Sequence, residues 1–248
     1  MNKIKIFTLA ILSVCSLAIS AKDYKASMFG VKSDGLTLNT RSIQKGVDFI
    51  SENGGGRLVF YVGRYLTGTV QLKSNVTIKL QEGAVLVGTT SVYDYSGKNK
   101  ALITADSQQN IGITGKGGIE GQGAALLEKI NFQIQKGYLK EASEKGSPAL
   151  IAMNNCSDIT VEQINMMNSC GNTQSYSGCK NLVIKGVTVI SKAVAGTKGV
   201  LLSDCDGVKI SNSYIETSGA ELSSAGTSKN VSVVNCKSAT GKKLEATR

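Results

Sequence analysis

The sequence predicts an all-β protein folded as a single-stranded parallel β-helix, and two observations support this fold. One short phrase recurs, and its copies begin at Cys156, Cys179, Cys205 and Ser228. A repeat at intervals of this kind indicates units that stack on one another, because no unit can bury its own apolar face. Within each phrase the apolar residues alternate with polar ones, which is the spacing of a β-strand and not of a helix.

The first 21 residues are predicted to be a secretory signal peptide. Lys3 and Lys5 precede an apolar run over residues 6–19, and small residues around Ala21 form a cleavage site. The run is shorter than the roughly 20 residues that a membrane span needs. We therefore expect a secreted or periplasmic protein without a membrane span. Cys15 stands in a weak lipoprotein box, so a lipid anchor is kept as a minor alternative.

One β-helix domain is expected over residues 22–248, and a helix at about 40–53 should cap its first coil. Ile43, Val47 and Ile50 recur at helical spacing, Asn39 or Thr40 can cap the start, and three glycines follow the helix. Such a cap covers apolar side chains and strand edges that the first coil would otherwise expose. Glycine-punctuated strands are predicted next, at 58–61, 70–72, 76–80 and 85–87.

The repeated phrase also predicts two ladders of stacked side chains. Equivalent residues of neighbouring coils should lie about 4.8 Å apart. Cysteines stacked in this way point their Cβ atoms in the same direction, which disfavours disulfides, so we expect buried, reduced thiols extended by Ser228. Turn residues that tolerate left-handed backbone should form the second ladder. The thiol ladder is Cys156, Cys179 and Cys205, and the turn ladder is Asp158, Asn181, Gly207 and Asn230.

Composition narrows the class of partner and excludes several kinds of site. The net charge of +10 favours a polyanion such as acidic polysaccharide, nucleic acid or an anionic membrane, although a general solubility charge is the plain alternative. The chain has no histidine and no C-x-x-C pair, so a zinc site is not expected. No metal and no cofactor is predicted. The sequence does not indicate an oligomeric state.

Longer stretches of the chain resemble the polygalacturonases and related pectinases of glycoside hydrolase family 28. The resemblance covers about Met28 to Cys236 and is carried by residues 33–60, 63–89, 110–123 (NIGITGKGGIEGQG) and 147–169. It implies a right-handed parallel β-helix that hydrolyses galacturonosyl bonds in pectin with inversion. It also implies an acidic, pectin-like polysaccharide as the partner, and no nucleic acid. The chain is short for the family at its C-terminal side.

The resemblance further implies positions for the two carboxylates that an inverting glycosidase needs. The family's Asn-Thr-Asp-Gly segment is matched by 196–199, where Lys198 replaces the aspartate. Its Gly-Asp-Asp segment is matched by 217–220, where Gly219 and Ala220 replace both aspartates. The family's Gly-His-Gly segment has no equivalent, and its Arg-x-Lys substrate clamp would lie beyond Arg248. We therefore assign no catalytic residue at these positions.

Three hypotheses follow from these replacements. The first is a degenerate family member that binds acidic glycan or persists as a stable coil, with Lys198 and Asn172 as substrate-binding candidates. The second is an active hydrolase with a rearranged site, for which Glu221 is the substitute carboxylate. The third is a structural or adhesive solenoid. Because Lys198 and Glu221 each stand seven residues before a ladder position, we also expect these two side chains to be neighbours on stacked strands.

Overall fold

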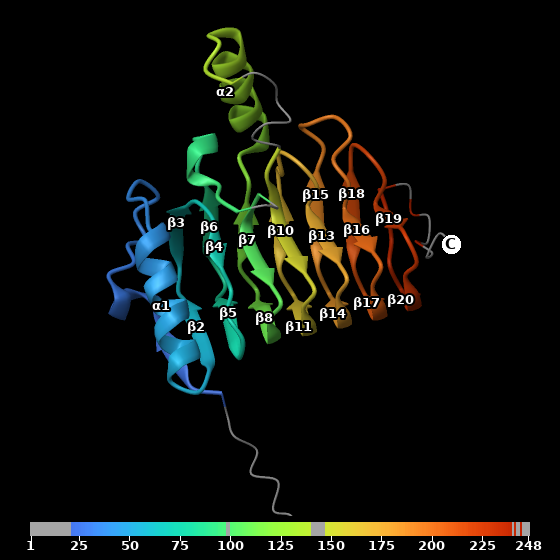
Figure 1. The fold of residues 1–248 in the computed structure, drawn as a ribbon, viewed down its shortest axis with the longest axis horizontal. Helices are drawn as coiled ribbons and strands as arrows, with labels where there is room; N and C mark the ends of the chain where they lie inside the picture. Colours follow the sequence, from blue (N-terminus) through green and yellow to red (C-terminus); the bar gives the residue numbers. More distant parts are fainter. Residues whose placement is uncertain (1–20, 98–99, 140–146, 240, 242–243, 245–248) are drawn as a thin grey trace, which may run out of the picture.

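The computed structural model describes residues 21–97, 100–139, 147–239, 241 and 244. Its strands wind into one parallel β-helix with three faces, and neighbouring strands within a face come from successive coils (Figure 1). Sheet A contains β1 (Asp23–Lys25), β2 (Gly56–Phe60), β5 (Val76–Leu80), β8 (Gln109–Gly115), β11 (Ser157–Glu162), β14 (Lys180–Lys185), β17 (Asp206–Ser211) and β20 (Lys229–Val234). Sheet B contains β3 (Gly63–Thr67), β6 (Ala84–Gly88), β9 (Gly118–Glu120), β12 (Asn165–Met167), β15 (Thr188–Ser191) and β18 (Tyr214–Thr217). Sheet C contains β4 (Val70–Gln71), β7 (Ala101–Asp106), β10 (Ala149–Asn154), β13 (Gln174–Ser177), β16 (Val200–Ser203) and β19 (Leu222–Ala225).

The interior of the coil is filled by stacked apolar side chains, one from each turn. On sheet A, Ile111, Ile159, Leu182 and Val208 lie in register, and all four are buried. Burying a side chain of this size contributes roughly 1.5–3 kcal/mol. The alternation seen in the sequence therefore separates a packed core from an outer face on every strand.

The predicted thiol ladder is confirmed. Cys156, Cys179 and Cys205 are at most 1% exposed and unpaired, and the pairing of β11, β14 and β17 places them on successive coils. Ser228 extends the ladder, because its Oγ accepts a hydrogen bond of 3.2 Å from the Cys205 N–H. The pKa of Cys179 is raised, because hydrogen bonds with the thiols on either side and burial all favour its neutral form. These cysteines act as small apolar core residues.

The turn ladder is confirmed as well. Asp158, Asn181, Gly207 and Asn230 all adopt left-handed backbone, with φ between 52° and 72°. The Asn181 amide donates to Asp158 at 3.0 Å, and the Asn230 amide donates at 2.7 Å to Asp206, which neighbours the glycine. Short polar side chains tolerate this conformation and pair along the stack.

Helix α1 (Thr40–Glu52) caps the first coil, as predicted. Ile43, Val47 and Ile50 are fully buried beneath it. Asn39 occupies the N-cap position, but its side chain does not cap the helix. The Asn39 amide instead bonds both the N–H and the carbonyl of Lys32, at 2.8 and 2.9 Å, and so closes the preceding loop.

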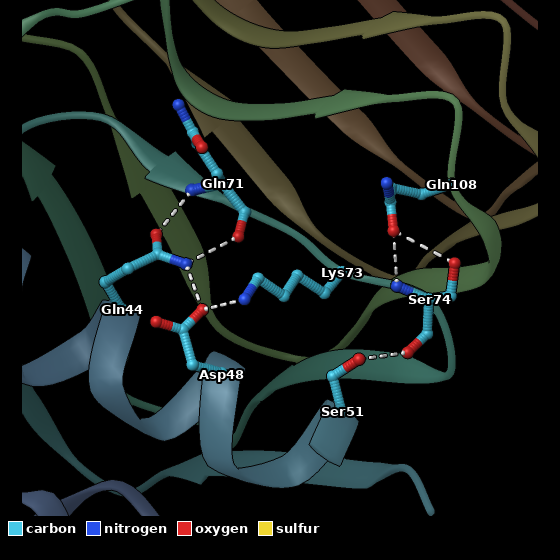
Figure 2. Close-up of polar contacts among 7 residues, drawn as sticks. All are labelled: Gln44, Asp48, Ser51, Gln71, Lys73, Ser74 and Gln108. Carbon is cyan, nitrogen blue, oxygen red and sulfur yellow. Dashed lines mark hydrogen bonds and ion pairs between the residues drawn. The ribbon is translucent and has the colours of Figure 1, made fainter.

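The same helix covers the free edge of sheet C. The carboxamide of Gln44 accepts a hydrogen bond from the Gln71 N–H at 2.8 Å and donates one to the Gln71 carbonyl at 3.0 Å (Figure 2). It therefore pairs with edge strand β4 as a neighbouring strand would. An unpaired edge invites association with other chains, and this side chain removes that opportunity at Gln71.

One helix was not expected from the sequence. Helix α2 (Gly123–Gln135) lies between β9 and β10 and projects from one end of the sheets (Figure 1). Leu126 and Ile130 are buried at its base, while Phe132 is half exposed. Two short 3-10 helices, η1 (Ala26–Phe29) and η2 (Val92–Asp94), complete the described elements. Within the described part of the chain, no helix is both long enough and apolar enough to cross a membrane.

Candidate functional site

A polar groove lies along the outer face of sheet C. Its volume is about 800 Å³, and it is lined by residues from β4, β7, β10, β13 and β16 together with their flanking turns. The outward side chains form two rows across the coils. One row is Thr104, Ala152, Ser175 and Leu201, and the other is Asp106, Asn154, Ser177 and Ser203. Small hydroxyl and amide groups of this kind can hydrogen-bond to sugar hydroxyls without filling the groove.

The sequence contains a signal for this groove that the prediction did not use. The register of β8 and β11 places Gln108 beside Cys156, one coil before the thiol ladder. A polar residue stands two positions before Gln108 and before each ladder cysteine: Asp106, Asn154, Ser177 and Ser203. Equivalent positions of stacked coils fall on one line. These residues therefore mark the groove floor as regularly as the cysteines mark the core.

Three of the candidate site residues stack in one column at the N-terminal ends of the sheet C strands. In sheet C, Gln174 pairs with Val200, and Val200 pairs with Leu222. Extending this register by two residues toward the N-terminus of each strand aligns Asn172, Lys198 and Ala220. The backbone bonds Thr173 N–H to Lys198 carbonyl (2.7 Å) and Gly199 N–H to Ala220 carbonyl (3.0 Å) extend the ladder into this region. Asn172 also lines the groove.

The predicted pairing of Lys198 with Glu221 is wrong by one residue. The register places Glu221 beside Gly199, and within the described chain no ion pair joins Glu221 to Lys198. The cause is one extra residue between β19 and the ladder position Ser228. Gly226 occupies this turn with φ of 66°, and the Asp204 carboxylate accepts the N–H of the next residue at 2.8 Å. Counting seven residues back from Ser228 therefore stops at Glu221, one residue short of Ala220, the true neighbour of Lys198.

Backbone carbonyl groups crowd the position of Gly219. A Cβ atom there would lie 2.9 Å from the carbonyl oxygens of both Gly196 and Thr197, closer than such atoms approach in folded proteins. The Gly219 N–H also donates to the Thr197 carbonyl at 2.8 Å. A longer side chain at 219 would require the two turns to separate. Ala220, by contrast, is exposed.

The nearby carboxylates have structural partners. Lys192 and Tyr214 both donate to Glu216, and these hydrogen bonds lower its pKa and favour the ionised form over the proton-donating form that a general acid needs. Asp204 and Asp206 hold the turns described above. Asp106 is the one carboxylate among the described residues that line the groove. The described residues that line the groove therefore offer no pair of carboxylates.

Two further features of the site bear on ligands. In the described residues, no three histidine, cysteine, aspartate or glutamate side chains gather closely enough to hold a metal.

Gln174 is fully buried below the groove, and its Oε1 accepts a hydrogen bond of 2.9 Å from the Tyr176 hydroxyl. Sequence pattern did not reveal this buried amide, because it occupies a position where the alternation predicts an apolar side chain.

Comparison with known proteins agrees with this architecture. A crystal structure of a candidate glycosyl hydrolase from Parabacteroides merdae is 48% identical, with a TM-score of 0.86, and the match covers 92% of this chain and all of that one. The family 28 exopolygalacturonase of Yersinia enterocolitica superposes with a TM-score of 0.78 at 22% identity, over 88% of this chain and 49% of that one. This likeness shows the fold, a right-handed parallel β-helix.

Curated relatives are longer than this chain. A "probable polygalacturonase" of Vitis vinifera is 28% identical over 221 residues, which cover 80% of this chain and 43% of the relative. The chain thus spans about half the length of the curated relatives that it matches. The model for the glycosyl hydrolases family 28 matches residues 58–244, so the chain belongs to that family.

Proposed function

We propose that this protein is an exported member of the family that binds acidic, pectin-like polysaccharide along the sheet C groove without hydrolysing it. The column of Lys198 and Ala220 carries this proposal. It stands where the resemblance places catalytic carboxylates, yet it holds an amine and a methyl group. Neither can deliver or accept the protons that inversion requires at neutral pH.

The closed turn at Gly219 supports the loss of hydrolysis independently of side-chain identity. Because the carbonyls of Gly196 and Thr197 occupy the space beside its Cα, the position cannot carry an aspartate without a backbone shift. Inverting glycosidases need two carboxyl groups roughly 6.5–9.5 Å apart to hold the attacking water. Asp106 alone does not supply such a pair in the described groove.

Charge and groove chemistry support the binding half of the proposal. The chain carries 28 basic and 18 acidic residues, which attracts a polyuronate through forces that weaken as salt is added. The groove adds hydroxyl and amide groups for the sugar rings, and Asn172 joins it to the Lys198 column. These contacts favour a glycan over nucleic acid, because the described groove offers few cations and its lining is mainly small and uncharged.

Retention on immobilised polygalacturonate tests the binding half. We expect the protein to be retained at low salt, to elute as salt rises, and to pass freely through a neutral glucan matrix. Equal retention on both matrices would contradict the acidic glycan partner and leave the hypothesis of a structural solenoid.

Export is tested separately, since residues 1–20 lie outside the described structure. N-terminal sequencing of secreted material should begin near residue 22, whereas an acylated Cys15 would establish the lipoprotein alternative.

A further inference from the structure

The segment Gln71–Ser74, where the groove meets the capping helix, is held rigidly by side chains from outside its own strand. Besides the Gln44 pairing described above, the Ser51 hydroxyl donates to the Ser74 carbonyl at 3.0 Å. The Gln108 Oε1 accepts from both the N–H and the hydroxyl of Ser74, at 2.8 and 2.9 Å (Figure 2). The backbone of this segment is therefore fixed before any ligand arrives.

Two polar side chains of this segment line the groove. Gln71 and Lys73 stand two residues apart, on either side of buried Leu72, and both contribute to the groove wall. Figure 2 shows the Gln71 side chain directed away from Gln44, so its carboxamide is not used in the edge pairing. The spacing of two residues along an extended chain is about 7 Å, which suits two contacts to one sugar residue.

Asp48 positions the ammonium group of Lys73 but does not engage all of its N–H donors. Asp48 of helix α1 accepts its hydrogen bond at 3.0 Å, and the same oxygen accepts from the Gln44 amide at 2.9 Å. An ammonium has three N–H donors, and Asp48 Oδ1 engages one of them. The Lys73 side chain is 42% exposed, so solvent or a ligand can reach the others.

We propose that Gln71 and Lys73 form a uronate-binding subsite at the α1 end of the groove, with the Lys73 ammonium recognising a sugar carboxylate and the Gln71 amide a hydroxyl. The proposal rests on the proposed polysaccharide function, and it specifies that the sugar carboxylate is recognised and that recognition takes place at the α1 end of the groove. Asp48 and Gln44 act as positioning residues. Helix α1 thereby couples closure of the β-helix to construction of the binding face.

The test is a binding titration with polygalacturonate and with its methyl-esterified form, which keeps the sugar and removes the charge. Lys73→Gln should weaken binding of the acid form about two- to tenfold, the effect of one hydrogen-bonded contact. It should leave binding of the ester unchanged. Lys209→Gln removes an equal charge from an outward position of sheet A and should change neither by more than about twofold.

A second variant, Asp48→Asn, distinguishes recognition of the ligand by Lys73 from structural support of the segment. It keeps the acceptor oxygen for Lys73 and Gln44 but removes a negative charge beside the subsite, so binding of the acid form should tighten. Weaker binding by Asp48→Asn, or equal losses in Lys73→Gln and Lys209→Gln, would overturn the subsite while leaving the proposed function intact. Failure of the unaltered protein to bind the acid form at all would overturn both.

Discussion

Replacing Gln44 by alanine should destabilise the protein more than its half-exposed position on a helix would suggest. The substitution removes the hydrogen bonds of 2.8 and 3.0 Å that pair with the Gln71 backbone, and a third of 2.9 Å to Asp48. Each such bond contributes about 0.5–1.5 kcal/mol net, so loss of the two backbone bonds should cost about 1–3 kcal/mol. Alanine recovers a few tenths of a kcal/mol through its helix propensity.

Lys45→Ala is the matched control, because Lys45 is exposed on the same helix one position away and gains the same propensity. Urea unfolding followed by circular dichroism would compare the two variants with the unaltered protein. We expect Gln44→Ala to lower the free energy of unfolding by about 1–3 kcal/mol and Lys45→Ala to change it by less than about 0.5 kcal/mol. Equal midpoints for the two variants would show that side-chain capping of β4 contributes nothing.

Three further predictions concern other parts of the molecule. Gly219→Asp should lower the thermal midpoint clearly while Ala220→Asp leaves it nearly unchanged, because only the first places a Cβ against two carbonyls; similar midpoints would refute the closed turn. Hydrogen bonds from residues 36 and 37 lower the pKa of Asp34 to about 2, so the stability it adds is complete above pH 3.8 and is lost as pH falls toward 2. An NMR titration that places its midpoint near 3.8 would contradict this. A thiol assay on unreduced, denatured protein covering residues 21–248 should find five reactive groups, since the cysteines of the described chain are unpaired, and three or fewer would indicate a disulfide.

The sequence predicts the coil architecture well because stacking imposes a repeat on the residues themselves. The positions of Cys156, Cys179 and Cys205 predict both the thiol ladder and the strand register around it. The capping helix follows from Ile43 and its apolar partners, which bury one face. In both cases the same residues that carry the pattern make the contacts.

Other features could not be read from the pattern. Helix α2 is an insertion within one coil, so no repeat predicts it, and its apolar residues give only a weak helical face. The register between Lys198 and Ala220 depends on the extra turn residue Gly226, which a count from the ladder cannot detect. The pairing of Gln44 with Gln71 joins side chain to backbone, and no residue spacing encodes such a contact.

The most direct test of the central claim is the release of reducing ends from polygalacturonate during prolonged incubation at high protein concentration. Loss of one proton-transferring group typically removes about 10² to 10⁴ in rate, and here all three aspartates expected from the resemblance are replaced, by Lys198, Gly219 and Ala220. We therefore predict that product from the unaltered protein does not exceed the blank. Product above the blank that Glu221→Gln abolishes would contradict the account and establish a rearranged catalytic site.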